Sequence, residues 1–264
     1  MKSVIRILFL LIAVLPFVWL FSTSLRSAEE IFRYPPTFLP DAFHWNNYTE
    51  VFDAIPFLLY FFNSIIVAIS AVALNLLLAS LAGFALARLQ FKGKSFFFLM
   101  VLGAMMIPKE ITVIPLYTVV LRMGLADTLA GVIIPFAVEG LAVFMMRQAF
   151  LAIPKEIEEA AIIEGCSPLM LWWRVMMPMT RPVLATLAIF TFIGTWGDFL
   201  WPLIVLRDSS QYTLQIGLNS MLGTFVNNYR LVAAGSVLAL IPVIAVFMIT
   251  QKYFERGILS GAGK

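Results

Sequence analysis

The sequence predicts an all-α integral membrane protein with six transmembrane helices. Its composition is the first observation behind this prediction: 61% of the side chains are hydrophobic and only 12% are charged, whereas globular chains average roughly 45–50% and about 25%. The second observation is that apolar residues form long continuous segments, because a helix needs roughly 20 of them to cross about 30 Å of hydrocarbon. The third is an unequal distribution of Lys and Arg among the connecting segments. A membrane β-barrel would instead show alternating segments of about ten residues.

The predicted spans are the apolar segments that reach transmembrane length, 4–22, 61–87, 96–120, 129–150, 183–206 and 231–251. The first span, preceded by Lys2 and Arg6, could also be a signal peptide. Its bulky end, Trp19-Leu20-Phe21, does not resemble a small-residue cleavage region, which favours a retained helix. The third span is interrupted by Met106-Ile107-Pro108-Lys109-Glu110, which places a proline and two charges in an apolar stretch. We expect one transmembrane domain over residues 1–264.

The positions of Lys and Arg predict the orientation of these spans. With the amino terminus inside, 12 of the 18 basic residues fall on the inner side and 6 on the outer side. Cytoplasmic loops carry an excess of basic residues, so both termini are predicted to be cytoplasmic. The long outer segment 23–60 contains Tyr34-Pro35-Pro36, Pro40 and Pro56, which favour an irregular chain on the surface.

The segment 154–177, between the fourth and fifth spans, predicts two short helices joined at a glycine. The first follows Ile153-Pro154, has an acidic first turn and stops at Gly165, the preferred residue just past a helix end. Ser167 and Pro168 suit the start of the second helix, which we expect Met177-Pro178 and Pro182 to end before the fifth span. An apolar stripe at helical spacing marks this second helix, namely Leu169, Trp172, Trp173 and Met176.

Two interpretations of this segment are open from its residues alone. It could be an amphipathic hairpin that lies on the bilayer surface. It could instead dock to another protein, because the small side chains of Ala160 and Ala161 allow close approach and the turn at Gly165 makes a rigid joint.

The same segment resembles a known motif. Glu159-Ala160-Ala161, then Gly165 six positions after the glutamate, then Met177-Pro178 twelve and thirteen positions after the glycine, are similar to the EAA loop of the permeases of ATP-binding-cassette importers. Val175 and Met177 stand where that family prefers isoleucine and leucine.

Further stretches resemble the carbohydrate branch of this family, in particular its maltose-type second permease subunit. They extend over nearly the whole chain and comprise Trp45-Asn46-Asn47-Tyr48, Asn63-Ser64, Met106-Ile107-Pro108, Ile114-Pro115-Leu116-Tyr117, Trp196-Gly197-Asp198-Phe199-Leu200-Trp201-Pro202 and Arg256-Gly257. The family usually has asparagine where this chain has Gly197, so a polar contact is absent there.

The resemblance implies a permease subunit of a sugar importer in the cytoplasmic (inner) membrane of a bacterium or archaeon. Such a subunit pairs with a second permease and two ATPase subunits, and it receives solute from an extracytoplasmic binding protein. ATP and magnesium belong to the ATPase subunits, so no cofactor is expected on this chain. The residues implied to contact the ATPase are Glu159, Ala160, Ala161, Gly165 and Pro178, and the tail 257–264 is implied to approach the ATPase pair.

Ionisable residues inside spans are costly and usually face a cavity or a partner. The candidates for a solute pathway are Asp198, with Trp196 and Trp201 on either side of it, Glu110 after Lys109, and Glu139. At about 1.5 Å per residue along continuous helices, they cluster in the middle-to-outer half of the membrane. Polar contacts between helices or with the second permease are an equally open interpretation.

Other transport functions are also open from the sequence. The same architecture could import glycerol phosphate or a compatible-solute glycoside. An autonomous secondary transporter would use Asp198 and Glu139 for ion coupling, but the spans show no inverted repeat.

Other functional classes find little support in the sequence. The tripeptide Gly93-Lys94-Ser95 lacks the leading glycine of a phosphate-binding loop, because that position is Arg88. One cysteine and one histidine exclude an internal disulfide and disfavour a structural metal site. A net charge of +3 does not favour nucleic acid as a partner.

Overall fold

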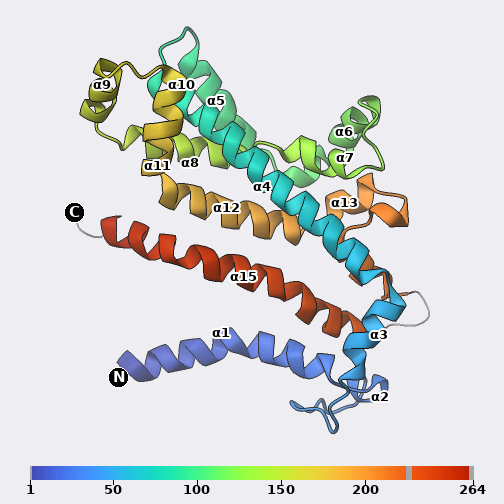
Figure 1. Ribbon diagram of the computed structural model, residues 1–264. Coiled ribbons are helices and arrows are strands. Elements are labelled where there is room, and N and C mark those ends of the chain that lie inside the picture. The colour runs from blue at the N-terminus through green and yellow to red at the C-terminus, as the bar shows by residue number, and fades with distance from the viewer. Residues whose placement is uncertain (1, 224–227, 262–264) are drawn as a thin grey trace. The chain divides into compact units, whose positions relative to one another are not determined.

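The computed structural model describes residues 2–223 and 228–261, and every element in that part of the chain is a helix (Figure 1). The chain divides into two units, one formed by residues up to Ser64 with Tyr212–Ile244, the other by Ile65–Gln211 with the residues from Ala245 onward. Two long helices, α4 (Phe57–Arg88) and α15 (Tyr229–Gly261), contribute residues to both units.

The first unit contains α1 (Lys2–Ser24), α2 (Ala28–Ile31), α3 (Asn46–Ala54) and α14 (Leu214–Ser220). Buried Asn47 joins them, since its amide nitrogen donates to the carbonyls of Ser24 and Arg26 at 2.9 Å and its oxygen accepts from Arg230. Arg230 also pairs with Glu50 at 2.6 Å. The Trp45–Tyr48 stretch therefore fastens the start of α3 to the end of α1 and the start of α15.

The second unit contains α5 (Lys94–Met105), α6 (Lys109–Arg122), α7 (Leu129–Ile133), η1 (Ile134–Phe136), α8 (Gly140–Leu151), α9 (Lys155–Ile163), α10 (Pro168–Met170), η2 (Leu171–Met176), α11 (Met177–Met179), α12 (Arg181–Trp196), α13 (Leu200–Val205) and η3 (Ser209–Gln211). Its apolar core lies between the last turns of α4, helix α8 and the segment 155–179, and includes Phe84, Met146, Phe150 and Met176. A close crossing holds α4 on α8: a Cβ at Gly83 would lie 2.7 Å from the Cβ of Met146.

Two helices in the described residues are long and apolar enough to cross a membrane without interruption, Phe57–Arg88 and Tyr229–Gln251. Three bent pairs raise this number to five if each pair is one span: Lys94–Met105 with Lys109–Arg122, Leu129–Phe136 with Gly140–Leu151, and Pro168–Met179 with Arg181–Trp196. The residues Leu8–Ser24 of α1 form a shorter apolar helix. All-helical architecture is thus confirmed, and the bends distinguish the structure from six straight spans.

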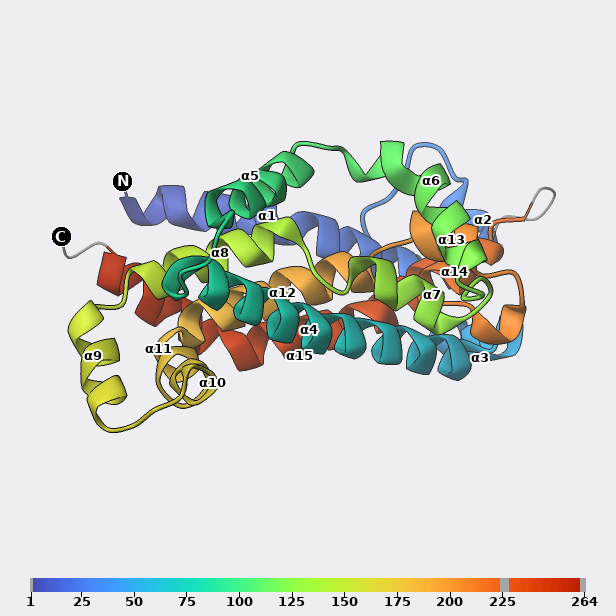
Figure 2. The same cartoon turned by 90° about the horizontal axis from the view of Figure 1, so that it is seen from above.

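The helices within the predicted spans 96–120, 129–150 and 183–206 are therefore not continuous. The chain turns by 108° between α5 and α6, as Figure 2 shows, and by 45° between Leu129–Phe136 and α8. The first bend comes at Pro108, whose ring and missing N–H prevent a helix from continuing. Helix α12 ends at Trp196, before the predicted 206, and α13 begins only at Leu200. Depths counted at a constant rise along the third, fourth and fifth spans consequently do not apply.

Candidate functional site

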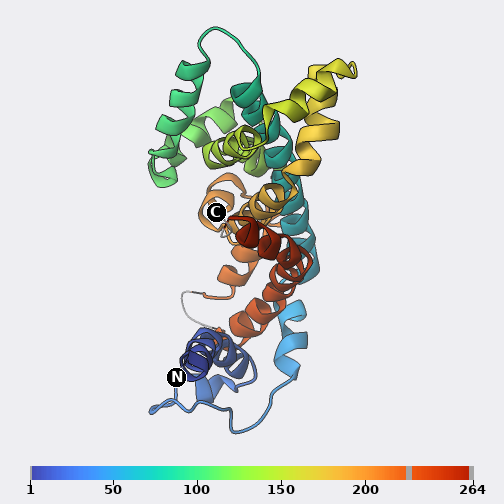
Figure 3. The same ribbon diagram turned by 90° about the vertical axis from the view of Figure 1, so that its left-hand side faces the viewer.

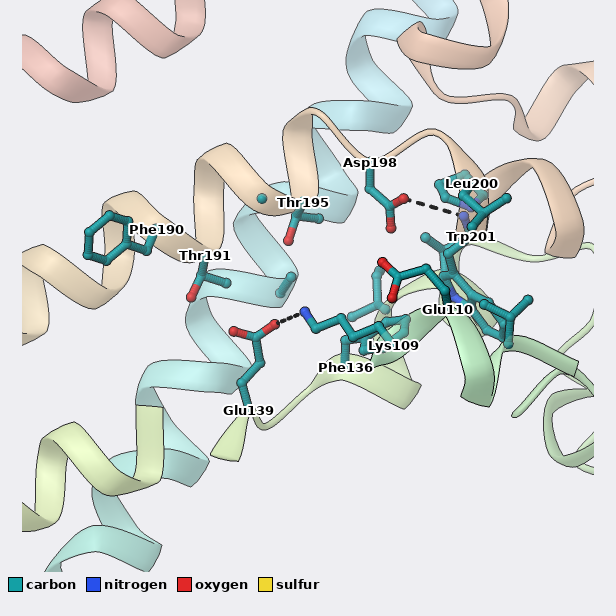
Figure 4. Close-up of a pocket in the computed structure, with 16 residues that line it drawn as sticks. Lys109, Glu110, Phe136, Glu139, Phe190, Thr191, Thr195, Asp198, Leu200 and Trp201 are labelled. Carbon is teal, nitrogen blue, oxygen red and sulfur yellow. Dashed lines mark hydrogen bonds and ion pairs between the residues drawn. The ribbon is translucent and has the colours of Figure 1, made fainter. Parts of the chain in front are cut away.

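The polar residues predicted inside the spans meet at one cavity of about 250 Å³ in the second unit (Figure 4). Three interruptions of the helices open onto it: the start of α6 after Pro108, the junction of η1 with α8, and the gap between α12 and α13. Non-helical backbone at membrane depth is tolerated where it lines a cavity. The full lining is Ala71, Lys109, Glu110, Val113, Val132, Ile133, Phe136, Glu139, Phe190, Thr191, Gly194, Thr195, Asp198, Leu200, Trp201 and Pro202.

Each carboxylate of the cavity lies at the start of a helix. Glu110 is in the first turn of α6, Glu139 is the N-cap residue of α8, and an Asp198 oxygen accepts the backbone N–H of Trp201 in α13 at 3.3 Å. A helix start carries a partial positive charge and unpaired N–H groups, which favour a nearby anion. The breaks in the spans place these three acidic side chains at helix starts, which explains why the apolar segments tolerate them.

One cation lies among these acids. The Lys109 ammonium is 2.7 Å from a Glu139 oxygen and 5.4 Å from the centre of the Phe136 ring. With 67% of the Lys109 side chain exposed, this ion pair adds little stability but neutralises one carboxylate. Among the described residues, Glu110 and Asp198 have no ion-pair partner within 4.0 Å. The cavity therefore presents two carboxylates as hydrogen-bond acceptors, next to the hydroxyls of Thr191 and Thr195.

The two tryptophans beside Asp198 differ. Trp201 lines the cavity and meets the Phe136 ring edge-on, with the ring centres 5.6 Å apart. Trp196 does not line it: its ring is buried and stacked on Phe192 at 5.6 Å. Trp196 lies outside the cavity because α12 ends at that residue, so the register of one continuous helix does not extend to Asp198.

Sequence reasoning missed Asn75. Its buried amide donates to the Thr191 hydroxyl at 2.8 Å and accepts the backbone N–H of Glu139 at 3.0 Å. Asn75 therefore joins α4, α12 and the start of α8 directly behind the cavity. The available signal was an asparagine in the middle of the apolar segment 61–87, where a polar side chain is costly unless it is paired.

The segment 154–179 forms a hairpin in which α9 lies beside the helical run 168–179 (Figures 1 and 3). Gly165 has φ of 85°, in the region that favours glycine. Its N–H donates to the Ile162 carbonyl at 2.9 Å and that of Cys166 to the Ala161 carbonyl at 3.0 Å, which is the Schellman pattern of a helix end. Ser167 caps the next helix by accepting the N–H of Met170.

The two alanines of α9 face different surroundings. Glu159 and Ala160 are exposed, whereas Ala161 is 8% exposed and packs in the core of the second unit. Both alanines were expected on one docking surface. In this structure Ala160 is accessible to a partner, whereas Ala161 is covered by other residues of the second unit.

The second helix ends at Met179, between the prolines predicted to end it. The stretch Leu171–Met176 inside it is a π-helix. Its i to i+5 pattern buries Leu171 and Met176 together with Trp172, while Leu169 and Trp173 of the predicted stripe are exposed. Pro178 is exposed in α11.

The tail does not form a separate structural element up to its described end. Helix α15 runs to Gly261, and residues 262–264 of the predicted tail 257–264 lie outside the described residues.

Comparison with known proteins adds the family. A model described as "Binding-protein-dependent transport system inner membrane component" matches residues 1–260. The chain belongs to this family. It is therefore a permease, the membrane subunit of such a transport system, and the family resemblance of the sequence is confirmed.

The permease is 39% identical over 256 residues to the arabinooligosaccharides transport system permease protein AraQ of Halalkalibacterium halodurans, with 96% of this chain and 92% of that protein covered. It is 32% identical over 262 residues to the sn-glycerol-3-phosphate transport system permease protein UgpE of Rhizobium meliloti, covering 95% and 92%. A chain in the crystal structure of a bacterial ABC transporter involved in the import of the acidic polysaccharide alginate has a TM-score of 0.82 and 26% identity, covering 96% and 95%.

Proposed function

We propose that this permease is one of two membrane subunits of an ATP-driven importer for a sugar or a sugar-like solute. Two ATPase subunits supply the energy, and an extracytoplasmic binding protein delivers the solute. The family description, the arabinooligosaccharide and glycerol-3-phosphate permeases, and the alginate importer support this assignment. ATP and magnesium bind the ATPase subunits, and this chain is not an enzyme.

The cavity is the contribution of this chain to the solute pathway. The observation that carries this proposal is the convergence of three interrupted helices on one polar cavity, with Glu110 and Asp198 as acceptors and Trp201 and Phe136 as aromatic walls. Sugar hydroxyls donate hydrogen bonds to carboxylates, and the faces of sugar rings pack on aromatic side chains. A substitution that removes an acceptor without changing its shape is the matching test.

Asp198→Asn should lower solute uptake or change the preferred solute while the importer still assembles and its basal ATP hydrolysis is retained. Asp53→Asn, at an exposed position of α3, is the matched control. Uptake of radiolabelled arabinotriose and of glycerol 3-phosphate into proteoliposomes that contain the complete importer provides the measurement. Reduced assembly with unchanged uptake per assembled importer would favour a contact between helices over a pathway residue.

The proposed topology has six spans with both termini in the cytoplasm. It takes α1 as the first span and α4 and α15 as continuous spans. The third span is α5 with α6, the fourth is Leu129–Phe136 with α8, and the fifth is α12 with α13. Reporter fusions after Lys94 and Lys155 should be cytoplasmic, and fusions near Asp41 and Asp208 should be external. A cytoplasmic reporter at Asp41 would overturn this topology.

The hairpin 154–179 is proposed to dock to an ATPase subunit. Its exposed surface combines Glu159 and Ala160 with apolar residues that nothing in the second unit covers, Ile163, Leu169 and Trp173. Ile163 is 86% exposed, a large apolar area to leave in water. The turn at Gly165 fixes the two helices of the hairpin relative to each other, as a coupling joint requires.

A further inference from the structure

A buried guanidinium joins the docking hairpin to the rest of the second unit. Arg88 is the last residue of α4, and 5% of its side chain is exposed. It donates to the carbonyls of Phe150 at 2.7 Å and Ile153 at 2.5 Å, and it pairs with Glu158 of α9 at 3.2 Å. Arg88 therefore contacts the end of α8, the turn after it and α9 at once.

The chemistry of this junction is directional. A guanidinium is planar and holds several acceptors in a fixed fork, which a single ammonium group cannot do. The carbonyls it contacts lie at and just beyond the end of α8, where helix hydrogen bonds are missing. Removing the carboxylate of Glu158 would leave a buried charge with only backbone partners. Apolar contacts around the junction, such as those of Ala161, allow one helix to shift against another. The hydrogen bonds and the ion pair of Arg88 instead hold α4, the end of α8 and α9 at a fixed distance and angle.

Other basic side chains nearby contact carbonyls at the end of α4 and not α9. Lys94 donates to the carbonyls of Ala87 and Leu89, and Arg147 donates to that of Leu86. Within the described ranges, Glu158 is the carboxylate paired with Arg88, and Arg88 is the charged group that reaches from α4 to α9.

The same two helices extend from this junction to the cavity. Helix α8 runs from Leu151 back to Gly140, about 18 Å at 1.5 Å per residue, and its N-cap residue Glu139 lines the cavity. Helix α4 runs about 20 Å from Arg88 back to Asn75, which holds the N–H of Glu139.

Contacts between α4 and α8 are thus present at three levels. Asn75 and Glu139 meet at the cavity, Gly83 lies against Met146 midway, and Arg88 holds the Phe150 carbonyl at the junction. The pair can move as one body between the cavity and the hairpin.

We propose that Arg88 is a positioning residue for energy coupling, which transmits displacement of α9 to α4 and α8 and so to the cavity. The proposal rests on the proposed docking of the hairpin 154–179 to an ATPase subunit. Without the Arg88–Glu158 pair, α9 would still dock, but its movement would no longer determine the position of α4.

The test uses Glu158→Gln in the complete importer, with Glu156→Gln on the exposed side of α9 as the matched control. Assembly and basal ATP hydrolysis should be retained in both variants. Stimulation of ATP hydrolysis by the solute-loaded binding protein should fall about fivefold or more in Glu158→Gln, the lower end of typical coupling between sites. It should be unchanged in Glu156→Gln.

A distance measurement separates positioning from a general loss of structure. Spin labels on cysteines at Leu78 of α4 and Lys155 of α9, both exposed, report how firmly the two helices are joined. Cys166→Ser removes the native thiol. The distance distribution should be narrow in the parent importer with and without Mg·ATP and vanadate, and broad in Glu158→Gln. Arg88→Lys should broaden it too, because lysine keeps the charge but not the fork.

Narrow distance distributions in Glu158→Gln and Arg88→Lys, together with full stimulation of ATP hydrolysis in Glu158→Gln, would overturn the proposal. So would loss of assembly in Glu158→Gln but not in Glu156→Gln, because the pair would then only hold the fold. A parent chain that binds no ATPase subunit at all would instead contradict the proposed docking, which distinguishes the two failures.

Discussion

Single residues determine the geometry of the hairpin and of the loops around the cavity. Gly165 was predicted from sequence because the end of an amphipathic helix needs a residue that accepts positive φ. The burial of Ala161 was not predicted, since two adjacent alanines carry no signal for which one is buried. Asn75 was missed because one asparagine does not change the hydropathy of a long apolar segment.

Gly165→Ala should destabilise the hairpin by about 1 kcal/mol, because φ of 85° is unfavourable for a residue with a Cβ although no atom lies within 4 Å of that position. Gly103→Ala is the matched control: it is also free of contacts but lies inside α5, where alanine is favoured. The melting temperature of the purified permease and the rate of trypsin cleavage near Lys155 measure the effect of each variant. Equal stability of the two variants would contradict a strained turn.

Asp127, in the loop between α6 and α7, is expected to hold the start of the segment after α13. Its carboxylate accepts the N–H groups of Asp208 at 2.9 Å and Arg207 at 2.8 Å, and these hydrogen bonds lower its pKa below the usual 3.8. The stabilisation is therefore complete above about pH 4 and is lost as pH falls through the lower folded pKa. Asp127→Ala should speed hydrogen exchange at the Arg207 and Asp208 amides at pH 7. Asp127→Asn should have a small effect, because asparagine keeps an acceptor and tolerates the φ of 59° at this position.

At the scale of elements, hydropathy predicted where helices occur but not where they bend. The straight spans α4 and α15 are uniformly apolar, so composition was sufficient for them. At the break before α8, the backbone N–H of Glu139 is bonded by Asn75 of α4, a partner from another helix that local hydropathy does not reveal. The π-helix at Leu171–Met176 was not predicted either, because apolar residues at α-helical spacing do not reveal an i to i+5 pattern.

Gly83→Ala should loosen the crossing of α4 and α8. The added Cβ would lie 2.7 Å from the Met146 Cβ and 2.9 Å from the Arg147 backbone nitrogen, so the backbones must separate, at a cost of about 1–3 kcal/mol. Thermal stability of the purified permease relative to Gly103→Ala provides the measurement. Equal thermal stability of Gly83→Ala and Gly103→Ala would show that α4 and α8 do not cross as closely as described.

At the scale of the whole molecule, α4 and α8 extend from the polar cavity to the hairpin 154–179, which is proposed to dock to an ATPase subunit. Composition and loop charges predicted the membrane class and the all-helical fold, and the resemblance of the 154–177 segment predicted the family. The grouping of Glu110, Glu139 and Asp198 in one cavity required the structure, because residues far apart in sequence meet there only after three helices break.

Cysteine cross-linking of the hairpin to the ATPase tests the central claim most directly. In the assembled, active importer with Cys166→Ser, Ala160→Cys should capture an ATPase subunit, because Ala160 is exposed on α9. Ala161→Cys, buried in the core of the second unit, should capture much less. Docking of the hairpin to an ATPase subunit predicts capture of that subunit at Ala160. No capture at Ala160 in an importer that hydrolyses ATP and transports solute would contradict this docking.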